Sequence, residues 1–334
     1  MFEKLRVFAD IGRVQGITTT ASIAIVGAFT SAAQVEWYHI IYLTIVACFA
    51  HMALNTYIAI GDLELDIHTY VPSRNPVASG ELSIKDAFHF VYFGTISCVA
   101  LILILLYYSW NLSSFLALLC FIPAYIWLVW YGWKGKKYII SYDFSFSVSY
   151  AFFVLFGVFV IGGMPTIYTW IFIGIVFFAA TAFAQWENGL KDVDADRSVG
   201  VRSFAVLTNV ENNKKLHLFH PYFVYGSLLK IGFIICCLIT FLYYSNFYFL
   251  LFIVIYGIPS QIFIMYRFLT KRLPIDHRKT ILFDVVFAAI LGYSVIIRKT
   301  GFIPILFLMI YIIGGYLIGS WFQSKCEFKF SRFS

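Results

Sequence analysis

Long apolar runs separated by short polar connections dominate this chain. Several runs extend for about 20 residues, the length that an α-helix needs to cross the hydrocarbon core of a bilayer. The pattern predicts an all-α, polytopic transmembrane bundle of nine to ten helices. The expected spans cover residues 15–33, 38–61, 86–107, 112–131, 144–162, 166–186, 221–244, 246–266, 280–297 and 302–322.

Composition agrees with a single membrane-embedded domain covering residues 1–334. Hydrophobic residues make up 61% of the chain and charged residues only 12%. Most of the six cysteines lie inside the expected spans, and their spacing matches neither a metal site nor a disulfide framework. We therefore interpret the cysteines as small apolar residues of the bundle.

The charges of the connections alternate along the chain. Lys and Arg are absent from the connections near residues 34–37, 108–111, 163–165 and 245, whereas the N-terminus and the connections between these are basic; Arg298 and Lys299, near the last expected span, break the alternation. Because basic connections stay in the cytoplasm, we expect this basic set and the N-terminus to face that side. The net charge of +7 follows from this topology and does not indicate nucleic-acid binding.

Acidic residues gather in two segments, each of which follows a long apolar run. Ten of the 17 acidic residues belong to these segments, and both segments fall among the basic, cytoplasmic connections. We therefore expect them to meet on one face of the membrane. The first segment contains Asp62, Glu64, Asp66, Glu81 and Asp86, and the second contains Glu187, Asp192, Asp194, Asp196 and Glu211.

A spacing of four residues recurs in both segments. Asp62 and Asp66 are four apart, as are Asp192 and Asp196, so each pair projects from one face of a helical end. Asn55 lies two turns before Asp62 on the same face. Carboxylates this close raise each other's pKa unless a cation neutralises them, and their hard oxygens suit Mg²⁺ bridged to substrate phosphates. Solvated helix ends are the simpler explanation, but the repetition on one face favours a functional site.

The order of these motifs resembles that of a known family. Asn55, DLELD at 62–66, NPVASGELS at 75–83 and KDVDADRSVGVRS at 191–203 are together similar to the UbiA-type intramembrane prenyltransferases. That family has an Asp-rich motif after its second helix, a short Pro-containing segment, and a second DxxxD motif after its sixth helix. The resemblance covers residues from about 13 to 270.

Three features depart from the family pattern. Ile58 and Ala59 stand where the family usually has an Asn–Asp doublet, and the loop at 131–138 is a loose match. A tenth span at 302–322 would also exceed the family's usual nine.

The resemblance implies a helical bundle around a central cavity whose polar mouth is capped by the two Asp-rich loops. Mg²⁺ would be held by the catalytic carboxylates, with Asn55 assisting and with basic side chains on the diphosphate oxygens. The implied partners are an isoprenyl diphosphate donor, a lipophilic acceptor and membrane lipid. The implied metal ligands are Asp62, Asp66, Asp192 and Asp196, and the implied diphosphate contacts are Lys191, Arg202 and one of Lys134, Lys136 or Lys137.

Prenyl transfer from a diphosphate requires a metal site, basic groups and an apolar pocket. Breaking an allylic carbon–oxygen bond leaves a carbocation and a highly charged diphosphate, which metal ions and fixed basic groups stabilise. The hydrocarbon chain needs an apolar slot, and the cation needs a dry pocket, preferably with aromatic faces. We therefore expect Mg²⁺-dependent transfer of an isoprenyl chain to a lipophilic acceptor.

Two other functions fit parts of the pattern. A membrane terpene cyclase on the same scaffold would use the isoprenyl diphosphate without an acceptor. A transporter could bind a cation through the acids, although transporters usually bind near the midplane with broken helices. Lys230 and Asp284 lie inside expected spans, where a lipid-facing charge is costly; either the two residues pair with each other, or the ends of these spans lie elsewhere.

Overall fold

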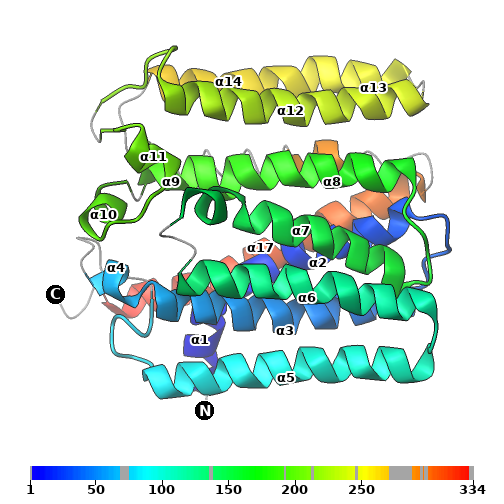
Figure 1. Ribbon diagram of the computed structural model, residues 1–334, viewed down its shortest axis with the longest axis horizontal. Helices are drawn as coiled ribbons and strands as arrows, with labels where there is room; N and C mark the ends of the chain where they lie inside the picture. Colours follow the sequence, from blue (N-terminus) through cyan, green and yellow to red (C-terminus); the bar gives the residue numbers. More distant parts are fainter. Residues whose placement is uncertain are drawn as a thin grey trace.

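The computed structural model describes residues 2–67, 75–134, 138–191, 193–211, 214–244, 247–270, 288–293, 296 and 300–330. Its long helices run side by side along one axis, and the described residues contain no strand (Figure 1). The expected all-α bundle is therefore confirmed.

The helices follow the apolar runs closely. In the first half of the chain they are α1 (Phe2–Ile11), η1 (Val14–Gly16), α2 (Ile17–Thr30), α3 (Trp37–Gly61), α4 (Leu63–Ile67), α5 (Ile84–Tyr108), α6 (Leu112–Trp133) and α7 (Ile139–Val160). In the second half they are α8 (Ile167–Ala180), the π-helix η3 (Thr181–Glu187), α9 (Asn188–Lys191), α10 (Val193–Ser198), α11 (Phe204–Leu207), α12 (Pro221–Tyr244), α13 (Phe247–Phe252), the π-helix η4 (Ile253–Gly257), α14 (Ile258–Thr270) and α17 (Phe302–Phe330).

Among the described residues, five helical stretches are long and apolar enough to cross a membrane, and four shorter apolar helices accompany them. The protein is therefore an integral membrane protein. The expected span at 280–297 lies largely outside the described residues, so the number of spans stays a prediction. The five long stretches are Trp37–Gly61, Ile84–Tyr108, Leu112–Trp133, Pro221–Tyr243 and Phe247–Thr270.

Side-chain caps fix where several spans begin. Ser83 accepts a hydrogen bond from the backbone N–H of Asp86 at the start of α5 (3.0 Å), and Asn111 does the same for Ser114 at the start of α6 (2.9 Å). Each cap satisfies an N–H that the first helical turn leaves without a partner. The polar capping residues in the short connections thus determine where these helices begin, which composition alone does not.

Glycines allow α2 and α7 to pack backbone against backbone at the centre of the bundle. A Cβ atom on Gly157 would lie 1.9 Å from the carbonyl oxygen of Ala24, and one on Gly27 would lie 2.4 Å from that of Val154. Small residues at such crossings are typical of membrane helices, whose association depends on close packing. The α2–α7 pair therefore forms a firm wall for the cavity described below.

The connections separate into two groups at opposite ends of the bundle. Figure 1 shows α4, α9, α10 and α11 at one end, while the short links from α2 to α3, α5 to α6 and α7 to α8 lie at the other. We call the first group's end the acidic end, because both acidic segments lie there. The expectation that the two acidic segments share one end of the bundle is confirmed.

Candidate functional site

The first acidic segment continues the last turn of α3. The backbone N–H of Asp62 donates to the carbonyl oxygen of Ile58 (2.9 Å), and that of Asp66 donates to the carbonyl oxygen of Asp62 (2.8 Å). The spacing of four residues therefore corresponds to one helical turn, as the sequence predicted. Both carboxylates are half-buried.

Asn75 ties this segment to the end of α3. Its side-chain Nδ2 donates to Asp66 Oδ2 (2.8 Å) and to the carbonyl oxygen of Ala59 (2.7 Å), while its Oδ1 accepts from the backbone N–H of Val77 (3.1 Å). Asn75 is buried, so these bonds are shielded from water. Sequence reasoning gave Asn75 no role. Asn75 does begin the NPVASGELS segment of the family resemblance, and its Asn–Pro pair is typical of a turn.

The second acidic segment places its two described aspartates differently. Asp196 in α10 is only 2% exposed, whereas Asp194 lies on the surface and pairs with Arg197 at 3.5 Å. After α10, the chain turns at Gly200, whose φ of +74° favours glycine. The backbone N–H of Val201 then donates to the carbonyl oxygen of Asp196 (2.9 Å). The turn thus directs the chain from Asp196 back toward the bundle.

The two acidic segments meet through an apolar cluster at the acidic end. Its buried members Ile58, Tyr131 and Val201 come from α3, α6 and the turn after α10. Ile58 lies one turn before Asp62, and Val201 follows Asp196 by five residues. In addition, a Cβ atom on Gly61 would lie 2.0 Å from the carbonyl oxygen of Gly132, so α3 and α6 nearly touch there.

The remaining predicted site residues occupy the same end or lie outside the description. Asp192, Lys136 and Lys137 lie outside the described residues, and Lys191 is described only in its backbone as the last residue of α9. Lys134 and Arg202 are exposed, and Lys134 Nζ lies 4.5 Å from the centroid of the Trp133 ring. In the part of the chain that is described, no three His, Cys, Asp or Glu side chains lie close enough to hold a metal ion.

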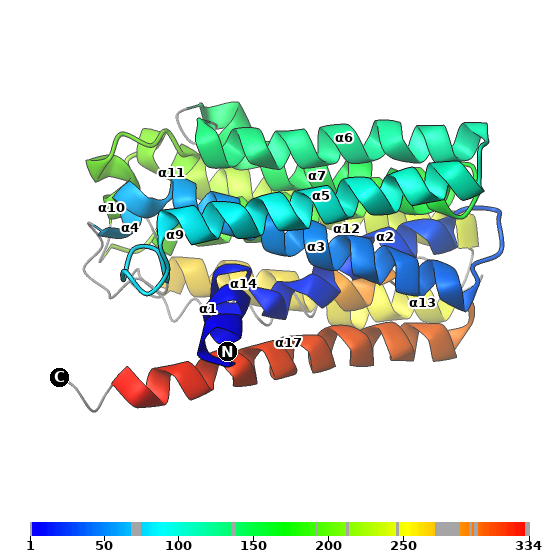
Figure 2. The same ribbon diagram turned by 90° about the horizontal axis from the view of Figure 1, so that it is seen from below.

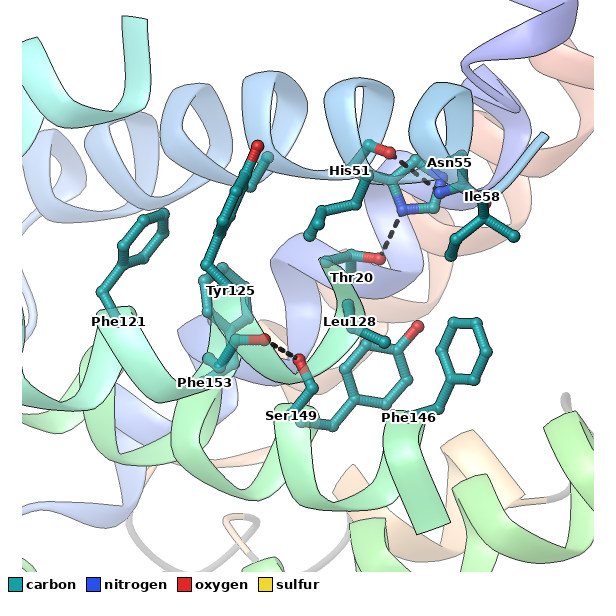
Figure 3. A pocket seen from close by; sticks show the side chains of 14 residues that line it. Thr20, His51, Asn55, Ile58, Phe121, Tyr125, Leu128, Phe146, Ser149 and Phe153 are labelled. Atoms are coloured by element: carbon teal, nitrogen blue, oxygen red, sulfur yellow. Dashed lines mark hydrogen bonds between the residues drawn. The ribbon is translucent and has the colours of Figure 1, made fainter. Parts of the chain in front are cut away.

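A cavity of about 40 Å³ lies between α2, α3, α6 and α7 (Figure 3). Asn55 and Ile58 lie at one end of it, toward the acidic end, and Phe121 and Tyr125 lie at the other. Its other lining residues are mostly apolar or aromatic, namely Thr20, Ala50, His51, Leu54, Ala124, Leu128, Phe146, Ser149, Tyr150 and Phe153. The cavity therefore has the largely apolar and aromatic lining expected for a hydrocarbon chain.

Polar groups in the cavity are held by hydrogen bonds within the protein. His51 Nδ1 lies 2.8 Å from Thr20 Oγ1, and His51 Nε2 lies 3.0 Å from the carbonyl oxygen of Arg13. Because a carbonyl oxygen only accepts, Nε2 carries the hydrogen of this bond. Asn55 Nδ2 donates to the carbonyl oxygen of His51 (2.8 Å). Sequence reasoning identified Asn55 but missed His51 and Thr20, because neither belongs to a spaced motif.

A buried ion pair precedes the second acidic segment. Lys230 Nζ in α12 donates to Glu187 Oε1 at the end of η3 (2.8 Å), and the two side chains are 6% and 0% exposed. The sequence suggested Asp284 as the partner of Lys230. Lys230 pairs with Glu187, and Asp284 lies outside the described residues, so a pairing of Lys230 with Asp284 stays a prediction. Position in the sequence gave no hint of this pair, because the two residues are 43 apart.

Trp186 fixes the same junction of η3 and α12. Its Nε1 donates to the carbonyl oxygen of Tyr222 (2.9 Å), and the Tyr222 hydroxyl donates to the carbonyl oxygen of Trp186 (2.5 Å). Gly226 leaves room for the indole ring, since a Cβ there would lie 1.9 Å from it. The second acidic segment therefore begins at a tightly packed junction between η3 and α12.

The profile of the UbiA prenyltransferase family matches residues 19–291, a stretch that includes both acidic segments and the cavity. This chain belongs to the UbiA prenyltransferase family. Among curated protein sequences, none matches it.

Solved structures of UbiA homologues share the fold. A UbiA homologue from Archaeoglobus fulgidus bound to GPP and Mg²⁺ has 16% sequence identity and a TM-score of 0.64, with 87% of this chain and 99% of that chain covered. The apo structure of a homologue from Aeropyrum pernix K1 has 16% identity and a TM-score of 0.66, with 86% and 98% covered. A digeranylgeranylglyceryl phosphate synthase has 18% identity and a TM-score of 0.58, with 94% and 99% covered.

Proposed function

We propose that this UbiA-family protein is an Mg²⁺-dependent prenyltransferase that moves an isoprenyl chain from its diphosphate to a lipophilic acceptor within the membrane. The main support is the apolar cluster of Ile58, Tyr131 and Val201, which brings both acidic segments to one end of an aromatic-lined cavity. The A. fulgidus homologues bound to GPP or DMAPP together with Mg²⁺ support the choice of donor.

The four spaced aspartates are the proposed metal ligands. Mg²⁺ in such sites takes one or two carboxylates, several waters and substrate phosphates, so a complete protein cage is not required. Asp62 and Asp66 on one turn, with Asp66 oriented by Asn75, suit this coordination. Asp192 and Asp196 would supply the second pair. Bound Mg²⁺ would neutralise the charge that develops on the departing diphosphate.

Basic side chains at the acidic end are the proposed contacts of the diphosphate oxygens. Arg202 directly follows Val201, and Lys134 directly follows α6, so both belong to the elements that meet beside Ile58. Lys191 and Lys136 are proposed for the same role on their sequence position. Asn55, buried in the cavity below this end, would assist there.

The cavity is the proposed location of the allylic cation that forms when the donor loses its diphosphate. Once the carbon–oxygen bond breaks, the allylic cation faces aromatic rings and few water molecules, which favours attack by the acceptor over hydrolysis. Phe146, Tyr150 and Phe153 are the aromatic lining residues contributed by α7. The proposed orientation places the acidic end in the cytoplasm, because the basic connections lie there.

Product analysis tests the proposal. Purified protein would be given isoprenyl diphosphates of several chain lengths with Mg²⁺, with and without an extract of membrane lipids. We expect diphosphate release that requires the extract and a product heavier than its acceptor by one prenyl unit. Release without the extract, with a hydrocarbon product, would identify a terpene cyclase instead. No release with any donor would refute both enzymatic functions.

A further inference from the structure

We propose that Tyr150, Thr20 and His51 form a proton relay in the cavity. Through this relay, His51 takes up the proton that a hydroxyl group of the acceptor loses when it attacks the isoprenyl cation. The inference rests on the proposed function, because it assigns the base of that reaction.

The His51 imidazole is held at both of its ring nitrogens. Its Nε2 donates to the carbonyl oxygen of Arg13 (3.0 Å), and its Nδ1 lies 2.8 Å from Thr20 Oγ1. Because Nε2 carries the hydrogen, Nδ1 of the neutral ring has the free lone pair and accepts from the Thr20 hydroxyl. The nitrogen that contacts Thr20 is therefore the one that can take up a proton.

Tyr150 extends this line of hydrogen bonds from α2 to α7. Its hydroxyl group hydrogen-bonds the Thr20 side chain. Since the hydrogen of the Thr20 hydroxyl is engaged with His51, Tyr150 is the donor of this second bond. Figure 3 shows Thr20 between His51 of α3 and Phe146 of α7. Tyr150, Thr20 and His51 all line the cavity, so they form a continuous polar line on its wall.

The backbone before α2 is shaped to hold the imidazole. Arg13 has a φ of 49° and a ψ of 52°, a left-handed conformation that is costly for a residue other than glycine. Its carbonyl oxygen accepts from the backbone N–H of Gly16 (2.9 Å) as well as from His51. Gly16 also leaves room for the ring, because a Cβ atom there would lie 2.7 Å from His51 Cε1. Backbone strain of this kind is concentrated at functional sites.

The long helix α17 fixes this segment from outside. It packs along η1 and α2, and Figure 2 shows it running past α1 along this side of the bundle. A Cβ atom on Gly319 would lie 2.4 Å from Gln15 Cα, and one on Gly315 would lie 2.3 Å from the Thr18 side chain. The Arg13 carbonyl and the Thr20 hydroxyl are therefore fixed before any substrate binds, as preorganised catalytic groups are.

The relay lies at the depth where the cation forms. The carbon that reacts is bonded directly to a diphosphate oxygen, so it lies just below the acidic end. Asn55, the proposed assistant of the diphosphate, donates to the carbonyl oxygen of His51 (2.8 Å). The two residues are four apart on α3, so His51 lies one helical turn, about 5.4 Å, deeper in the cavity. An acceptor hydroxyl that attacks this carbon is therefore beside Tyr150.

The relay accounts for every bond and proton of the transfer. The donor's carbon–oxygen bond breaks and its electron pair leaves with the diphosphate, while the acceptor oxygen forms a bond to the cationic carbon. The acceptor hydroxyl passes its proton to the Tyr150 oxygen, Tyr150 passes its own to Thr20, and Thr20 passes its own to His51 Nδ1. The resulting imidazolium donates to Thr20 and to the Arg13 carbonyl. His51 is half-buried, so it returns the proton to water when the products leave.

This arrangement selects a hydroxyl group among the possible nucleophiles. An amine is already protonated at neutral pH and has no lone pair for the attack. A carbon-bound hydrogen does not form an ordinary hydrogen bond to a tyrosine oxygen. The relay therefore suits an acceptor that reacts through an alcohol or a phenol.

Two matched tyrosines test the relay. Tyr150→Phe removes the relay hydroxyl, whereas Tyr311→Phe removes a similar hydroxyl bonded to Thr44 (3.3 Å), outside the cavity. Single-turnover transfer to the membrane-lipid extract would be measured with Mg²⁺ and the isoprenyl diphosphate that reacts fastest, and the Kd of that donor would be measured separately. We expect Tyr150→Phe to slow transfer by about 100-fold or more, the usual contribution of a general base, with the donor Kd unchanged. Tyr311→Phe should change neither quantity.

Variants of the other two members separate proton transfer from a structural role. His51→Gln keeps an amide N–H for the Arg13 carbonyl but cannot take up a proton, and Thr20→Val keeps the side-chain shape without the hydroxyl. We expect both to slow transfer as Tyr150→Phe does. Thr20→Ser retains the hydroxyl and should retain transfer. The double variant Tyr150→Phe/His51→Gln should be no slower than the slower single variant, because the members of one relay act as a unit.

The outcomes separate this inference from the proposed function. If Tyr150→Phe behaves as Tyr311→Phe does, or if His51→Gln transfers at the full rate, another base such as the departing diphosphate takes the proton and the relay is refuted, although the function stands. Losses that multiply in the double variant, or a weaker donor Kd that explains them, would also refute the relay. If Thr20→Val does not fold, the two tyrosine variants decide. If the unaltered protein prenylates nothing in the extract, the proposed function fails, and the inference fails with it.

Discussion

The two acidic segments share a spacing of four residues but are held in place by different interactions. The first is an extension of α3 and is fastened by backbone hydrogen bonds and by the amide of Asn75. The second follows a π-helix and starts beside the buried Glu187–Lys230 pair and the tightly packed Trp186. Local hydrogen bonds thus position the carboxylates of the first segment, whereas contacts between helices that are distant in sequence position those of the second.

Because the two segments are held by different interactions, substitutions in them should affect different properties of the protein. A local clamp such as Asn75 orients one carboxylate, so its loss should act mainly on metal binding. A buried ion pair joins two helices, so breaking it should act first on stability.

Removing a metal-binding carboxylate from either segment should have the largest effect. We expect Asp62→Asn and Asp196→Asn each to lower kcat by about 100-fold or more, because an amide cannot replace the charge that holds the metal. Glu64→Gln and Asp194→Asn are the matched controls, since both acids are exposed neighbours in the same segments. Diphosphate release measures all four. If a control variant loses as much kcat as its partner, the acids four residues apart have no special role in metal binding.

Breaking the buried ion pair should destabilise the fold. Lys230→Met removes the cation paired with Glu187 and leaves a buried carboxylate, which costs about 3–5 kcal/mol. The double variant Glu187→Met/Lys230→Met removes both charges and should regain most of that stability. Thermal unfolding in detergent compares the three proteins. A double variant as unstable as Lys230→Met would show that the pairing of charges is not what matters at this junction.

Removing the amide clamp should weaken metal binding with a smaller effect on folding. We expect Asn75→Ala to raise the Mg²⁺ concentration needed for half-maximal activity by about tenfold, because partners that orient a ligand typically contribute that much. Ser79→Ala alters the same connection at an exposed position and serves as the control. If Asn75→Ala instead lowers kcat at saturating Mg²⁺ and leaves the Mg²⁺ concentration for half-maximal activity unchanged, Asn75 does not act by orienting a metal ligand.

The exposed ion pair between Glu211 and Lys214 should contribute least. Lys214 hydrogen-bonds Glu211 at 2.5 Å and lowers the pKa of its carboxyl group. A lowered pKa stabilises the fold only above the ordinary pKa of the group and is lost as the pH falls through the lowered value. Because both side chains are in water, we expect Glu211→Gln to leave Tm unchanged from neutral pH down to below pH 4.5. A clear loss of Tm at neutral pH would contradict this difference between exposed and buried pairs.

Much of the fold was predictable because apolar runs of membrane length leave few alternatives to a helix. The geometry of Asp62 and Asp66 was predictable for the same local reason, since four residues make one turn. The Glu187–Lys230 pair was not, because its partners meet only after α8 and α12 have packed.

Binding of the donor with and without metal tests the central claim most directly. Thermal unfolding of the purified protein would be followed with an isoprenyl diphosphate alone, with Mg²⁺ alone and with both together. If the aspartates of the two segments jointly hold a metal-bound diphosphate, Tm should rise markedly only when both are present, and Asp62→Asn should abolish the rise. The same rise without Mg²⁺, or in Asp62→Asn, would contradict the claim.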